Sequence, residues 1–242
     1  MNKTVILIAG TWENELVFAQ LLAKNHKYLF AGKILMDFRS KQSYKAGFDW
    51  EYDREILGVN SENLPKKPSH MKSVFMIEGK ANSLEDLNSF CEVISEIIKI
   101  GGADVKIFNC EREIVFSADE WGELSFNKNV IFDIFVSNSY SKQGTWTWGM
   151  NNFSQKDIFT PLEFDEDAKN LVLSFAWWII NENPKIESGE TFSLDSSSPV
   201  FVILDMPNDE TINKETFSHN PLGFWKLYPQ EWLLNQTGNN QE

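Results

Sequence analysis

The residues that could carry out chemistry are few and lie far apart in this sequence. The three histidines are His26, His70 and His219, one in each of three predicted loops, so they form no local metal-binding pattern. The motifs G-x-S-x-G, H-E-x-x-H, G-x-x-x-x-G-K and G-x-G-x-x-G are all missing. The sequence therefore predicts no catalytic residue, no metal site and no cofactor.

One enzymatic pattern is present, the tripeptide Glu78-Gly79-Lys80 at the end of a predicted strand. In metal-dependent nucleases an E-x-K pair lets the carboxylate hold a divalent cation while the lysine stabilises charge at the scissile phosphate. Asp53 is the upstream carboxylate that could complete such a site. Two surface residues without a catalytic role at a strand end would give the same tripeptide. The metal-dependent site is therefore the alternative interpretation, and a structural role for Glu78 and Lys80 is the first one.

Acidic and aromatic residues alternate shortly before this strand. The acids are Asp49, Glu51, Asp53 and Glu55, and the rings between them are Phe48, Trp50 and Tyr52. At the two-residue repeat of a strand, the carboxylates share one face and the rings share the other. The pattern predicts either a half-buried strand with a solvated outer face or an acidic ridge that docks a basic partner.

Tryptophan is unusually frequent, with nine residues in the chain. Trp146 and Trp148 alternate with Thr145 and Thr147, so both indoles are expected to project from one strand face. They either pack the sheet against a helix or line a binding surface, because large aromatic side chains contribute most of their energy through burial. Trp146 and Trp148 are therefore further candidates for partner binding.

The elements that would position these residues follow a strand-helix-strand order in the first half. Apolar runs and helical periodicity predict strands and helices in turn at residues 4–9, 13–24, 30–38, 74–77, 82–100 and 105–108. Asn82 and Glu85 have the spacing of a capping box at the start of the second helix. The segment 58–70 carries Pro65 and Pro68 and is the best candidate for a sub-boundary.

The second half is predicted to add four strands and one long helix. The strands are expected at residues 130–136, 145–150, 200–204 and 224–227, and the helix at 165–181. Because this helix is apolar on nearly all sides, Trp177 and Trp178 are expected to be core residues. The fold class is therefore α+β: a mixed sheet built from β-α-β units, with a buried helix in the C-terminal half. We expect a single domain over residues 1–234 and a disordered tail over 235–242.

Composition limits the class of protein further. The chain holds 35 acidic and 22 basic residues, a net charge of −13. Nucleic acid is bound through clustered Lys and Arg, and the bases are scattered here, so we expect no nucleic-acid partner. No stretch approaches the roughly 18 apolar residues of a membrane span, so no membrane contact is expected. Two isolated cysteines, Cys91 and Cys110, in a chain without an export signal indicate a cytoplasmic protein.

Three groups of segments resemble a known family. They are GTWENE with YLFAGKILMDF, GTWTWGMNNF before the acidic start of the long helix, and SGETFSLD with HNPLGFWKL. In this order the chain resembles a bacterial family known only as a domain of unknown function, whose members show similar G-M-x-x-F and N-P-x-G-x-W-x-L segments. The stretch Ser154-Gln155-Lys156-Asp157 departs from the more Gly-rich segment expected there. The resemblance implies an α+β domain and transfers no catalytic residue.

Together these features favour a binding protein over an enzyme. The first hypothesis is a non-enzymatic cytoplasmic protein that binds a basic protein partner, because an acidic surface attracts such a partner at long range. Small acidic proteins of this kind are often immunity proteins that neutralise a bacterial toxin by direct binding. The predicted partner-binding residues are Asp49, Glu51, Asp53, Glu55, Trp146 and Trp148. The alternative is a metal-dependent or small-molecule enzyme that uses Glu78 and Lys80.

Overall fold

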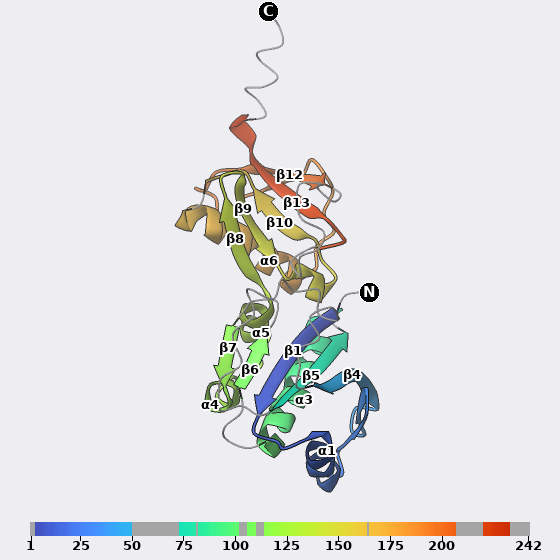
Figure 1. The fold of residues 1–242 in the computed structure, drawn as a ribbon. Coiled ribbons are helices and arrows are strands. Elements are labelled where there is room, and N and C mark those ends of the chain that lie inside the picture. The colour runs from blue at the N-terminus through green and yellow to red at the C-terminus, as the bar shows by residue number, and fades with distance from the viewer. Residues whose placement is uncertain are drawn as a thin grey trace, which may run out of the picture. The chain divides into compact units, whose positions relative to one another are not determined.

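The computed structural model describes residues 3–49, 73–80, 82–101, 106–109, 114–163, 165–206 and 220–232. The chain divides into two compact units; among the described residues, the first runs to Phe135 and the second begins at Val136. Each unit has a sheet of its own, drawn from blue to green in unit 1 and from yellow-green to red in unit 2 (Figure 1). The predicted sub-boundary at 58–70 lies outside the described residues. The division after Phe135 was not predicted, because a helix leads into a strand there with no Pro- or Gly-rich linker.

Unit 1 consists of a seven-stranded sheet and four described α-helices. In chain order its elements are β1 (Lys3–Gly10), α1 (Glu15–Lys24), β2 (Tyr28–Ala31), β3 (Ile34–Asp37), β4 (Gln42–Asp49), β5 (Ser73–Lys80), α3 (Leu84–Gly101), β6 (Lys106–Asn109), β7 (Ile114–Ser117), α4 (Ala118–Gly122) and α5 (Lys128–Phe135). The strand order is β2-β3-β4-β5-β1-β6-β7, and every neighbouring pair is antiparallel. Helix α3 packs on β5 and against α1, α4 and α5.

The strand directions show how the predicted β-α-β units are built. Strand β1 is antiparallel to both of its neighbours, β5 and β6, so these two run parallel to each other and α3 connects them. Because β5 is antiparallel to both β1 and β4, β4 runs parallel to β1. The order β6-β1-β5-β4, with α1 and α3 as crossovers, is that of a split β-α-β or ferredoxin-like arrangement. Strands β2 and β3 form a hairpin added between α1 and β4. The predicted α+β class is confirmed, with each crossover passing over an intervening strand.

Two local predictions for unit 1 were wrong. The expected single strand over 30–38 is the hairpin of β2 and β3, because the chain turns at Gly32, whose φ of +65° suits glycine. The expected strand over 130–136 is helix α5. Asn127 caps that helix, since its Oδ1 accepts hydrogen bonds from the backbone N–H groups of Asn129 and Val130. Helix α3 is also capped one residue later than predicted, by Ser83, which accepts from the N–H of Asp86.

Unit 2 contains a six-stranded mixed sheet and the long helix. Its elements are β8 (Ser137–Ser141), β9 (Gly144–Trp148), the 3-10 helix η1 (Met150–Phe153), β10 (Asp157–Thr160), α6 (Glu166–Glu182), β11 (Thr191–Phe192), β12 (Phe201–Met206) and β13 (Phe224–Pro229). The order is β11-β12-β13-β10-β9-β8, in which only the β10–β13 pair is parallel. The mixed sheet that the sequence predicts is therefore present in this unit.

Helix α6 covers one face of this sheet, as expected for the predicted buried helix. Asp165 caps it by accepting from the N–H of Ala168. Its buried side includes Phe175, whose ring lies 4.7 Å from that of Phe192 on β11. Trp177 and Trp178 are half-buried, with the ring of Trp178 packed beside the same phenylalanines. The core side of the helix is thus narrower than the nearly all-round apolar pattern suggests.

Candidate functional site

The predicted acidic ridge is described by the structure only at its first residue. Asp49 ends β4, where its backbone lies opposite Val74 of β5. Glu51, Asp53 and Glu55 lie outside the described residues. The ridge therefore stays a prediction.

The alternative enzymatic pair is placed at the end of β5. The Oε2 atom of Glu78 lies 3.7 Å from the Nζ atom of Lys45, its cross-strand neighbour on β4. The backbone of Lys80 lies opposite Lys3 of β1. Among the described residues, no three His, Cys, Asp or Glu side chains gather in a way that could hold a metal ion. The ion pair with Lys45 fits the interpretation of Glu78 as a structural residue of the sheet.

The other titratable groups with chemical potential lie in separate surroundings. His26 is exposed in the turn after α1, and His70 and His219 lie outside the described residues. Cys91 is fully buried in α3, and this burial raises the pKa of its thiol. A buried thiol with a raised pKa is a packing residue and a poor nucleophile.

Trp146 and Trp148 belong to a continuous aromatic face on the sheet of unit 2. The strand register places Ser139, Trp146, Phe159, Lys226 and Leu204 side by side across five neighbouring strands. Residues opposite one another in a ladder project to the same side of the sheet. We use the name aromatic face for the set Trp146, Trp148, Phe159, Val202, Leu204, Lys226 and Tyr228. All of its members except the buried Lys226 are half-buried, and the Nζ atom of Lys226 lies 5.1 Å from the centroid of the Phe159 ring.

The aromatic face is the side of the sheet away from α6. The residues that alternate with it, among them Thr145, Thr147 and Ile158, are fully buried. Phe192 shares their side, and its contact with Phe175 identifies this as the side on which α6 packs. Figure 1 shows α6 lying behind β8, β9 and β10. The side of β9 that carries Thr145 and Thr147 therefore packs against α6. Trp146 and Trp148 lie on the opposite side, so the interpretation that they pack the sheet against this helix does not apply.

The charge of the chain is concentrated in the same unit. Residues 136–242 contain fifteen acidic and six basic residues, a net charge of −9 out of the total of −13. The remaining 135 residues contribute only −4, from twenty acids and sixteen bases. The unit that carries the aromatic face is thus also the strongly acidic one.

A buried carboxyl group joins the two most distinctive segments of the sequence. Asp157, at the start of β10, is 1% exposed, and its Oδ1 atom accepts from the N–H of Met150 at 3.2 Å and from the Oγ1 of Thr147 at 3.4 Å. The Asn220 side chain also bonds to it and donates to the backbone oxygen of Gln155 at 2.8 Å. Burial raises the pKa of Asp157 to about 7, although these hydrogen bonds oppose the rise. The segments GTWTWGMNNF and NPLGFWKL are therefore fastened to each other at the start of β10.

Comparisons with known proteins add no relative. No protein-family model matches the chain, and no curated protein or solved structure does so. The resemblance to a bacterial family of unknown function thus stays an expectation from the sequence. No helix in the described part of the chain is long and apolar enough to cross a membrane.

Proposed function

We propose that this chain is a non-enzymatic protein that binds a basic protein partner on the aromatic face of unit 2. The observation that carries the proposal is the row of half-buried rings across neighbouring strands, on the side of the sheet away from α6. Tryptophan and tyrosine are the side chains that most often anchor protein interfaces, because they bury a large area with few rotatable bonds. A row of them on a sheet of fixed register gives a partner a preformed surface.

The charge of unit 2 supports a basic partner. With a net charge of −9, residues 136–242 attract a cationic protein over distances of about a Debye length, roughly 8 Å at physiological salt. Such attraction raises the association rate and makes it sensitive to ionic strength. The aromatic face then makes the contact with the partner, and the acidic residues of the same unit favour a partner of positive charge.

Neutralisation of a basic bacterial toxin is the biological role that we propose for this binding. An immunity protein acts by occluding its toxin, and needs a surface of complementary charge and no catalytic residue. The aromatic face and the acidity of unit 2 both support that role. The pairing of Glu78 with Lys45 gives no support to the enzymatic alternative.

Replacement of Trp146 by alanine is expected to weaken binding by about tenfold or more, because the indole is a large half-buried ring that lies directly beside Phe159 on the aromatic face. The partner is captured from extracts of the native host at low salt with the wild-type chain, and its dissociation constant is then measured for each variant. Trp232→Ala is the matched control, since Trp232 is exposed, lies after the last strand and is not one of the residues that make up the aromatic face. Equal affinities for the wild type and Trp146→Ala would remove the aromatic face from the account.

A further inference from the structure

The hairpin of β2 and β3 exposes an apolar surface in unit 1. Leu29, Ile34 and Phe38 are 37%, 50% and 55% exposed, and Met36 lies between them, half-buried. The register pairs Leu29 with Met36, so these side chains share one side of the hairpin. Single exposed apolar residues are ordinary, but a contiguous group on one face indicates an interaction surface.

This surface borders an edge of the sheet. Among the described strands, β2 pairs only with β3. The N–H of Phe38 donates to the backbone oxygen of Lys27 at 2.9 Å, so the backbone polar groups of Lys27 point toward β3. In an antiparallel pair, successive residues of a strand direct these groups alternately toward and away from the partner strand. The N–H and C=O groups of Tyr28 and Phe30 therefore point toward the free edge. Strand β2, with the sequence YLFA, has none of the charged or proline residues that usually protect an edge. An incoming strand can therefore form backbone hydrogen bonds there.

The hairpin region is basic within an acidic chain. Residues 24–45 contain six bases and a single acid, Asp37, which is 3% exposed. Three of the bases, Lys27, Arg39 and Lys45, form ion pairs with Glu96, Asp37 and Glu78. Even with these three acids counted, the bases exceed the acids by three. Lys33 is exposed at the turn of the hairpin and Lys41 at the turn between β3 and β4, and both favour an acidic ligand.

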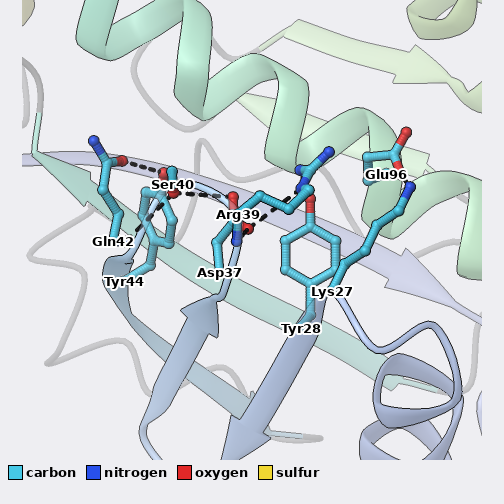
Figure 2. Close-up of polar contacts among 8 residues, drawn as sticks. All are labelled: Lys27, Tyr28, Asp37, Arg39, Ser40, Gln42, Tyr44 and Glu96. Atoms are coloured by element: carbon cyan, nitrogen blue, oxygen red, sulfur yellow. Dashed lines mark hydrogen bonds and ion pairs between the residues drawn. The ribbon is translucent and has the colours of Figure 1, made fainter.

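The opposite side of the hairpin is fixed by a polar network (Figure 2). Asp37 accepts from the N–H of Arg39 at 2.9 Å and from the Oγ of Ser40 at 3.0 Å, which closes the turn between β3 and β4. The guanidinium of Arg39 lies over the ring of Tyr28 and donates to its hydroxyl. Lys27 reaches Glu96 of α3 at 2.9 Å. The hairpin is thus held rigid from the side of α3, so its apolar side needs no ordering when a ligand binds.

We propose that the hairpin of β2 and β3 docks an extended, acidic segment of a partner protein, which adds a strand to β2. Backbone hydrogen bonds at Tyr28 and Phe30 give the affinity. Leu29 and Ile34 contact the apolar side chains of the segment, and Lys33 and Lys41 select its acidic ones. This proposal is independent of the function proposed above, because the surface lies in unit 1 and has the opposite charge.

The test uses the full chain and a synthetic peptide of sequence Glu-Val-Thr-Val-Glu-Val-Glu carrying a fluorescent label. Its binding is measured by fluorescence anisotropy at low salt, beside a version with Lys in place of Glu and a version with Pro at the central Val. The acidic peptide is expected to bind at least about tenfold more tightly than either of the others. Equal binding of the acidic and basic peptides, equal binding of the proline peptide, or no binding of the acidic peptide would overturn the proposal.

Two variants of one exposed residue supply the matched comparison. Leu29→Glu and Leu29→Lys remove the same apolar contact and differ only in charge, and far-UV circular dichroism checks that both fold. Leu29→Glu is expected to bind the acidic peptide about tenfold more weakly than Leu29→Lys does. Equal affinities of the two variants would contradict charge selection at this edge. The wild type could instead sediment as a dimer that the Leu29→Glu substitution dissociates. That result would show that the edge binds a second copy of this chain, and it would overturn the proposal of a partner segment.

Discussion

Replacement of Gly144 by alanine should destabilise unit 2 by roughly 3 kcal/mol or more. Gly144 begins β9 with a φ of +144°, a conformation that side chains with a Cβ rarely adopt. A Cβ atom there would lie 2.1 Å from the backbone oxygen of Thr160 and 2.9 Å from the Cα of Pro161. Since both contacts are backbone atoms of the neighbouring chain segment, the clash can be relieved only by moving β9 away from β10.

Gly189→Ala is the matched control for this effect. Gly189 also has a positive φ, +100°, but an added Cβ would meet nothing within 4 Å. It should therefore cost only about 1 kcal/mol, from the backbone conformation alone. Urea unfolding followed by tryptophan fluorescence measures both variants, because six of the nine tryptophans lie in residues 136–242. A Gly144→Ala midpoint equal to that of Gly189→Ala would contradict the close approach of β9 and β10.

The stability of unit 2 should fall as the pH rises from about 4 to about 7, through the titration of Asp157. Burial raises the pKa of this carboxyl to about 7 in the folded state, from the ordinary aspartate value of 3.8 that applies once the chain unfolds. The folded chain therefore holds a proton that the unfolded chain has released across this range. The contribution is fully present below pH 4 and lost above pH 7, and amounts to roughly 4 kcal/mol.

Two substitutions at the same position separate titration from hydrogen bonding. Asp157→Asn keeps an oxygen that can accept from Met150 and Thr147 but cannot ionise, so wild-type stability should fall relative to this variant between about pH 4 and pH 7. Asp157→Ala should be less stable than Asp157→Asn at every pH, because it leaves the buried N–H of Met150 without its acceptor. Urea midpoints across the pH series give both differences. A constant gap between the wild type and Asp157→Asn over the series would show that Asp157 does not titrate in this range.

Most of the long elements could be predicted from hydrophobic periodicity. Strands β1, β5, β12 and β13 and helices α3 and α6 lie within a few residues of their predicted positions. Each of these strands carries a short, mainly apolar run, and each of these helices carries apolar residues at helical spacing over several turns, so strand and helix could be told apart. The sequence predicts one mixed sheet, but only the sheet of unit 2 is mixed, through its parallel β10–β13 pair, and every strand pair in the sheet of unit 1 is antiparallel.

Shorter apolar runs were assigned wrongly, for physical reasons. The run over 130–136 has the composition of a strand, but Asn127 caps it as a helix and its side chains Ile131 and Phe135 are buried in unit 1. The run over 30–38 contains a turn at Gly32, and apolar strand residues stand before and after that turn, so hydrophobicity alone does not reveal it. A capping residue with tertiary packing decides the structure in the first place, and a turn residue decides it in the second; the local hydrophobic pattern decides neither.

The site was predictable only where it depends on one strand. Alternation alone places Trp146 and Trp148 on a common side, and the structure extends that side to Phe159 and Tyr228, which come from other strands. Asp157 was not singled out as a central residue. Its partners stand as far away as Asn220, 63 residues along the chain, and no local pattern reports such a contact.

The most direct test of the aromatic face is fluorine NMR of the chain labelled with 5-fluorotryptophan, recorded with and without the captured partner. Individual Trp→Phe variants assign the signals. Binding should shift the signals of Trp146 and Trp148, which lie on the aromatic face, and leave those of Trp12 and Trp121, which are buried in unit 1, in place. A bound partner that shifts neither Trp146 nor Trp148 would contradict the proposed docking surface.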